Sequence, residues 1–179
     1  MDQTLWVDGK RSKTIRVKMN PSSDFRGVIH AFDSIRLPKT AIDPENLKFA
    51  ILELINNSIR AHKERGEQRD ILVDMTIADG RLHIAIRDYG GGFDPSLLPY
   101  PVDSDPASLD IHTQAFHQYQ EKNGFKRFGM GIYLAKKTFE RFQLIFLDER
   151  DIPVSWAPGR IVGTLIRANL SVREDLDGK

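Results

Sequence analysis

The sequence predicts an α+β fold in which helices pack as one layer on a mixed, largely antiparallel sheet. Two Asp-Gly pairs, at residues 8–9 and 79–80, stand between apolar or β-branched runs, a pattern typical of β-hairpins. Other stretches repeat apolar residues at helical spacing. Because hairpins and helices follow one another without strict strand–helix–strand alternation, a two-layer α/β sandwich is favoured over a parallel sheet.

The N-terminal region is expected to form a hairpin and then a helix. Residues 4–7 and 14–19 are predicted to be two strands around the turn at Asp8 and Gly9. Residues 24–35 are predicted to be helical, closed by Pro38, because apolar side chains recur at helical spacing, namely Phe25, Val28, Ile29, Phe32 and Ile35.

A longer helix has the clearest boundaries. Asp43 is a suitable N-cap, Pro44 is tolerated at the first helical position, and Gly66 provides a stop. On a helical wheel, one apolar stripe must face the sheet: Leu47, Ile51, Leu54, Ile55 and Ser58. Glu53 and Asn57, four residues apart, share one flank of this stripe, whereas Asn56 points nearly opposite the core.

The C-terminal half is predicted to complete the sheet. Residues 71–77 and 82–87 are expected to pair across the second Asp-Gly turn, and 143–147 and 163–170 to form later strands. The polar stretch 95–124, with a short helix over 108–120, is interpreted as a lid. Residues 129–142 are predicted to be helical, 153–160 a turn-rich connection, and the charged tail from Arg173 is expected to fray.

Length and composition favour one soluble domain over residues 1–179. Lys and Arg total 26 and Asp and Glu 25, so no global field favours nucleic acid or a membrane, and partner choice must come from local sites. The chain has no Cys, which excludes disulfides and thiolate ligands and suits a reducing cytoplasm. No apolar run approaches membrane-spanning length, and the start lacks a signal-peptide pattern.

Glu53 and Asn57 can both reach a cleft at the margin of the core. The amide oxygen of Asn57 is a hard ligand suited to Mg²⁺, and the carboxylate of Glu53 is suited to act as a base. The alternative is that both are ordinary polar residues at a core margin.

Two glycine-containing loops add chemistry. Asp88 ends a strand, and its carboxylate can accept a hydrogen bond from an exocyclic amine such as that of adenine. Gly90 and Gly92 allow a tight turn and the close approach of a flat ligand. Gly129 and Gly131 open a helix, where unpaired N–H groups bind phosphate, and Lys126 and Arg127 precede it. Thr164 can join Asp88 at the base edge. Each loop could instead be a structural turn or an ordinary helix start.

Four features occur in this order: Glu53 with Asn57, the loop after Asp88, the loop at Gly129, and Thr164. Together they resemble the Bergerat ATP-binding fold of the GHKL, or histidine kinase-like, ATPase superfamily. Residues 53–57 are similar to its N box, 88–92 to its first glycine box, 128–131 to its second glycine box, and 163–164 to its late Gly-Thr. The resemblance covers about residues 43–170 and places a lid at about 95–128.

The resemblance implies ATP and Mg²⁺ as cofactors and assigns roles by position. It implies Asn57 as the Mg²⁺ ligand, Asp88 as the adenine reader, and Arg60 as a cation facing phosphate. Gly90 and Gly92 are implied as the turn beneath the base, and Gly129 and Gly131 as lid hinge and phosphate cradle. One departure is Arg127, which stands where the second glycine box usually has Gly.

The type of residue that receives the phosphoryl group is predicted from Glu53. A serine hydroxyl must lose a proton during phosphoryl transfer, whereas a neutral imidazole is already nucleophilic. Glu53 and the segments 57–62 and 92–95 therefore favour resemblance to anti-sigma-factor serine/threonine kinases, with a sigma factor or anti-anti-sigma protein as regulatory partner. The long 95–124 segment is more similar to a sensor histidine kinase lid, so a kinase acting on a His in trans stays open, as do a nucleotide-sensing binding module and a homodimer.

Overall fold

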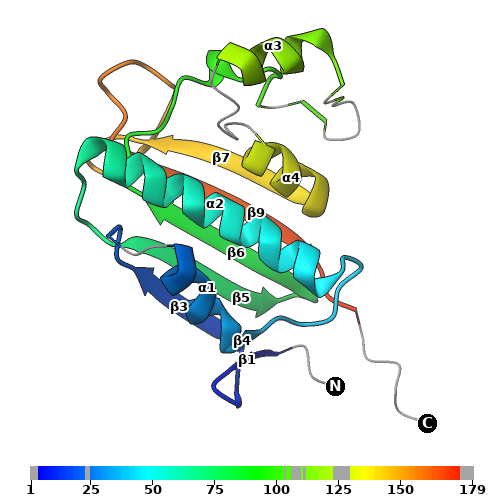
Figure 1. The fold of residues 1–179 in the computed structure, drawn as a ribbon. Coiled ribbons are helices and arrows are strands. Elements are labelled where there is room, and N and C mark those ends of the chain that lie inside the picture. Colours follow the sequence, from blue (N-terminus) through cyan, green and yellow to red (C-terminus); the bar gives the residue numbers. More distant parts are fainter. Residues whose placement is uncertain are drawn as a thin grey trace.

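A six-stranded antiparallel sheet, covered by helices on one face, forms the body of the computed structural model (Figure 1). The structure describes residues 4–22, 25–102, 104–105, 110, 112–122 and 130–173. The strand order is β3-β5-β6-β9-β7-β8, and every neighbouring pair is antiparallel. The bounds are β3 (Thr14–Met19), β5 (Ile71–Ala78), β6 (Arg81–Asp88), β9 (Gly163–Ser171), β7 (Arg141–Leu147) and β8 (Pro153–Val154).

The helical layer has α2 (Pro44–Arg65) at its centre. Helix α1 (Phe25–Asp33) lies beside α2 toward β3, and α4 (Met130–Thr138) lies on the other side, over β7 (Figure 1). A 3-10 turn, η1 (Pro95–Leu97), and α3 (Gln114–Lys122) belong to the connection between β6 and α4. The predicted α+β two-layer sandwich is confirmed.

The boundaries of α2 confirm the capping prediction. The carboxylate of Asp43 accepts from the N–H groups of Glu45 at 3.0 Å and Asn46 at 3.2 Å, with Pro44 following it. Gly66 ends the helix in the left-handed region, at φ 67°. The predicted stripe is buried against the sheet, at Leu47, Ile51, Leu54, Ile55 and Ser58.

The N-terminal strands pair differently from the prediction. Asp8 and Gly9 do form a two-residue turn, with φ of 48° and 76°, but this turn pairs Val7 with Lys10. Strand β1 (Leu5–Val7) therefore belongs with β2 (Lys10–Ser12) in a small sheet of order β2-β1-β4, while residues 14–19 form β3 at the edge of the large sheet. The predicted helix 24–35 ends two residues early, because Ile35 starts β4 (Ile35–Arg36) and pairs with Val7.

The helix predicted over 129–142 is too long. It ends at Thr138, and Arg141 and Phe142 begin β7, opposite Asn169 and Ala168 of β9. Polar and apolar residues alternate from Arg141 to Leu144, and this period of two favours pairing with β9 over another helical turn. In the predicted lid, the helix lies at 114–122 instead of 108–120.

Lys136 of α4 ties part of the predicted lid segment to the helical layer. Its ammonium group is buried and donates to the backbone carbonyls of Val102 and Ser104, the latter at 2.5 Å. A buried ammonium is costly without such acceptors, so these bonds fix where Val102 and Ser104 lie against α4. No helix within the described residues is long and apolar enough to cross a membrane.

Candidate functional site

A cavity of about 230 Å³ lies between α2, the end of β6, the loop that follows it, and β9. It brings together five residues singled out from the sequence: Asn57, Asp88, Gly90, Gly92 and Thr164. The rest of its lining is mainly apolar, with Leu54, Ala61, Phe93, Leu98, Ile132, Leu144 and Ile166, joined by Ser58, Glu64 and Arg65. An apolar hollow with a few convergent polar groups is typical of a small-molecule site.

Asp88 is the best-connected polar group in this cavity. Its side chain is 5% exposed, and its Oδ2 accepts from the hydroxyls of Ser58 at 3.0 Å and Thr164 at 2.5 Å. Its Oδ1 accepts from the N–H of Gly90 at 2.9 Å. The carboxylate is therefore held in one orientation at the cavity wall by three donors from three elements. Ser58 was expected only to face the core, and its hydroxyl contact with Asp88 was missed.

The loop after β6 is packed too tightly for side chains. A Cβ on Gly90 would lie 2.4 Å from the Cβ of Ala61, against the backbone of α2. Gly92 has φ of 64°, and a Cβ there would meet Ile161 and Phe146 at 3.0 Å. Residues 90 and 92 therefore require glycine because the loop approaches α2 and the β7 and β9 side of the cavity closely.

His62 of α2 is hydrogen-bonded to the loop after β6 and was not predicted as a site residue. Its side chain is fully buried in α2, and its Nε2 accepts from the N–H of Tyr89 at 2.8 Å. An imidazole that accepts at Nε2 is neutral, and burial lowers the pKa of His62 below its ordinary value. Its position four residues after Ser58, on the buried face of α2, was the only sequence signal. The guanidinium of Arg69 lies over the Tyr89 ring, 3.9 Å from its centre.

Glu53 and Asn57 lie on the flank of α2 that faces α4. A Cβ on Gly131 would lie 2.7 Å from Asn57 Nδ2 and 3.6 Å from Glu53 Oε2, so the first turn of α4 lies directly against these side chains. Arg60 donates from Nη2 to Asn57 Oδ1 at 3.4 Å. Glu53, Arg60 and Gly131 are thus neighbours of Asn57 although they do not line the cavity itself.

Three predicted site residues, Lys126, Arg127 and Gly129, lie outside the described residues. Asn57 offers one hard oxygen, and the described part of the chain holds no cluster of three His, Asp or Glu side chains that could bind a metal. This single oxygen fits a cation that takes most of its ligands from elsewhere. Mg²⁺ bound to the phosphates of a nucleotide is such a cation. The Asp88 carboxylate and the apolar walls fit a flat base with an amine at its edge.

The comparison with known families agrees with this geometry. The family described as "Histidine kinase-like ATPase domain" matches residues 22–148, which is more than two thirds of the chain and includes α2, the glycine loop after β6 and α4. No curated protein matches the chain.

Proposed function

The chain belongs to the histidine kinase-like ATPase domain family, and we propose on that basis that it is a regulatory protein kinase that uses Mg-ATP to phosphorylate a serine or threonine of a partner protein. The observation that carries the proposal is the convergence of Asn57 and Asp88 on one cavity of about 230 Å³. These two residues come from different elements, and each suits a different end of the same nucleotide.

The adenine end is assigned to Asp88. Because Ser58, Thr164 and Gly90 donate to its carboxylate, the group stays oriented and keeps lone pairs for the exocyclic amine of adenine. Guanine presents a carbonyl oxygen at the corresponding edge, and two facing acceptors repel, so the same geometry favours ATP over GTP.

The phosphate end is assigned to the flank beside Asn57. The bound nucleotide supplies the γ-phosphoryl group and its Mg²⁺ neutralises charge on the phosphates. Asn57 Oδ1 would hold the cation, Arg60 beside it would contact the phosphate oxygens, and the clearance left by Gly131 would let the N-terminus of α4 come close to them.

Glu53 is assigned as the general base. It lies one helical turn before Asn57, is 8% exposed, and faces the start of α4. An acceptor hydroxyl entering beside Asn57 would lose its proton to this carboxylate as its oxygen attacks the γ-phosphorus. A histidine acceptor would not need that base, which favours serine or threonine.

Transfer of labelled phosphate tests the proposal. The protein is incubated with γ-labelled ATP, Mg²⁺ and the proteins encoded by neighbouring genes, and the label is then treated with acid. We expect an acid-stable label on a serine or threonine of one partner. An acid-labile label would indicate a histidine acceptor, and no label with intact ATP binding would indicate a nucleotide-sensing module; either result overturns the proposal.

Glu53→Gln sharpens this experiment because it removes the base and keeps the shape of the side chain. We expect ATP affinity to remain nearly unchanged and transfer to slow by roughly 10²–10⁴-fold. Glu45→Gln, in the first turn of the same helix, is the matched control and should transfer at the wild-type rate. Equal rates for both variants would remove Glu53 from the mechanism.

A further inference from the structure

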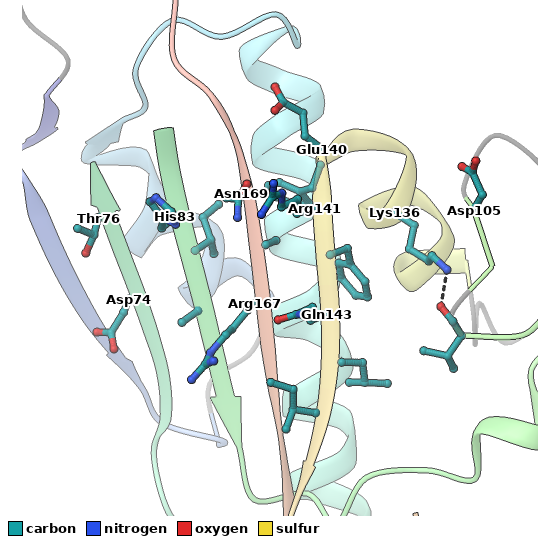
Figure 2. A pocket seen from close by; sticks show the side chains of 18 of the residues that line it. Asp74, Thr76, His83, Asp105, Lys136, Glu140, Arg141, Gln143, Arg167 and Asn169 are labelled. Atoms are coloured by element: carbon teal, nitrogen blue, oxygen red, sulfur yellow. Dashed lines mark hydrogen bonds between the residues drawn. The ribbon is translucent and has the colours of Figure 1, made fainter. Parts of the chain in front are cut away.

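The sheet has a second face, opposite the helices and the nucleotide cavity, that no helix covers. Strand register aligns its outward side chains in rows across five strands. The first row is Lys18, Leu72, Arg87, Leu165 and Ile145; the second is Arg16, Asp74, Ala85, Arg167 and Gln143; the third is Thr14, Thr76, His83, Asn169 and Arg141. Figure 2 views this open face, with α2 behind the strands. We call these three rows, with Arg81 and Ser171 beyond the third, the open face.

The open face concentrates positive charge. It carries six cationic side chains and one carboxylate, Asp74, whereas the whole chain has a net charge of only +1. Glu140 and Asp151 at the rim pair with Arg81 and Arg87, and the face still keeps a net charge of +3 when both are counted. Balanced overall charge therefore conceals a local cationic surface.

Arg141 and Arg167 are two of the cations on this face that remain available to a ligand. Arg16 is engaged by Asp74, with its Nε 2.6 Å from Oδ1. In contrast, the side chains of Arg141 and Arg167 form no hydrogen bond or ion pair with the parts of the chain that the structure describes, and both residues are exposed. Figure 2 shows Arg167 reaching from β9 toward β6, where its register partner is the small Ala85.

The open face is also hollowed. A groove of about 940 Å³ has Ala85 in its floor and is lined by Arg167, Gln143 and Asp74. It continues past β7 to Phe139 and Lys136. It can do so because β8 pairs only with Phe146 and Leu147, which leaves the first five residues of β7 with one strand neighbour, β9, among the described strands.

We propose that the open face is a docking surface for an acidic, partly apolar segment of a partner protein. Arg141 and Arg167 would meet carboxylates, and the first-row residues Leu72, Leu165 and Ile145 would contact apolar side chains on the side of these carboxylates that lies beyond Arg167. Two copies of the chain joined symmetrically through this face would oppose like charges, which is unfavourable. The backbone of a nucleic acid would meet the Asp74 carboxylate and the apolar side chains of Leu165 and Ile145 at positions where it needs cations.

The surface is tested by backbone amide NMR with poly-L-glutamate as the probe. We expect shift changes concentrated in β6, β7 and β9, weakening with salt. Arg141→Gln with Arg167→Gln should lower the affinity roughly tenfold, because two exposed cations facing the groove are removed. Lys10→Gln with Arg36→Gln removes the same charge at exposed positions of the small sheet and should change the affinity less than about threefold.

Several results would overturn the proposal. Equal losses in both double variants would show that the probe senses only net charge. Duplex DNA that shifts the same amides with higher affinity than poly-L-glutamate would indicate a nucleic-acid surface. Concentration-dependent shifts of these amides without any probe would indicate a second copy of the chain. The nucleotide cavity lies on the other face of the sheet, so none of these results bears on ATP binding.

Discussion

Asn56 and Asn57 are consecutive residues of α2, but their side chains lie in different surroundings. Asn57 lines the cavity proposed for the nucleotide, whereas Asn56 is about 100° away round the helix and does not. We expect Asn57→Ala to weaken Mg-ATP binding at least about tenfold, since even outer partners of a metal ligand are worth that much. Asn56→Ala should change it less than about twofold. Calorimetric titrations with Mg²⁺ and with a chelator measure both, and equal affinities would exclude Asn57 as the ligand.

His62 makes the stability of the protein depend on pH in a defined window. Burial, the largest influence, lowers the pKa of its imidazole below 6.5, although Asp88 and Glu67 act in the opposite direction. Below about pH 6.5 the unfolded chain therefore takes up a proton that the folded chain does not, so the free energy of unfolding falls as the pH falls toward the folded pKa. Carboxylates with a lowered pKa change the free energy of unfolding only at more acidic pH. Glu67 is one of them, because its hydrogen bond with the Arg69 guanidinium lowers its pKa to about 2.

Urea unfolding between pH 5 and 7 separates these effects. We expect the wild-type free energy of unfolding to fall with pH by up to about 1.4 kcal/mol per unit from this one group. His62→Gln removes the titrating imidazole and should flatten that slope, and its amide oxygen can still accept from Tyr89. His30→Gln, an exposed change in α1, is the control and should keep the slope. An unchanged slope in His62→Gln would contradict the role assigned to burial.

Helix α2 and the loop after β6 depend on each other through one contact. Because a Cβ on Gly90 would lie 2.4 Å from the Cβ of Ala61, Gly90→Ala should push the loop away from α2 and weaken ATP binding roughly tenfold or more. Ala61→Gly in the same chain removes the main clash and should recover part of the affinity, despite about 1 kcal/mol of lost helix stability. Fluorescence titrations of the single and double variants complete a mutant cycle, and no recovery would show that the contact is not the cause.

Elements fixed by local chemistry could be predicted from the sequence. Both Asp-Gly turns adopt positive φ at their two residues, and the caps of α2 lie at Asp43 and Gly66. Elements fixed by distant partners could not. Residues 14–19 join β5 rather than the neighbouring hairpin, and residues 141–142 join β9 rather than α4. Both segments take their structure from pairing with strands that are distant in the sequence. Local residue propensities cannot predict such pairing.

The same division applies to the candidate site. Residue types suited to the chemistry, such as Asn57 and Asp88, could be recognised from their spacing on a helix and at a strand end. The supporting contacts could not: Ser58 reaches Asp88 across 30 positions, and His62 reaches Tyr89 across 27. Both side chains also fit an amphipathic stripe, so only the placement of β6 beneath α2 reveals that their polar atoms are used.

At the scale of the whole molecule, the two faces of one sheet separate two tasks. The helical face holds the cavity proposed for the nucleotide, and the open face carries the surface proposed for an acidic partner. Strand β9 belongs to both, since Thr164 points into the cavity and Arg167, three residues later, points to the opposite face. A partner seated on the open face would therefore contact the strand that also positions Thr164 beside Asp88.

One hydrophobic core joins all these parts, which predicts cooperative unfolding. Its buried residues run from Leu5 in β1 to Val172 after β9 and include members of the sheet, α1, α2 and α4. We therefore expect far-ultraviolet and near-ultraviolet circular dichroism to report one coincident transition in urea. Two separated transitions would show that the chain does not unfold as one domain.

Ligand binding should then shift the whole transition. Mg-ADP at about 100 times its Kd should raise the free energy of unfolding by about 2.7 kcal/mol, because it binds only the folded chain. The shift should shrink in Asp88→Asn, since an amide cannot accept in the same way from Ser58, Thr164 and the base together. Mg-GDP, whose base presents a carbonyl to Asp88, should leave the midpoint almost unmoved. Equal shifts by the two nucleotides would mean that Asp88 does not select the base, and the cavity would then recognise phosphate alone.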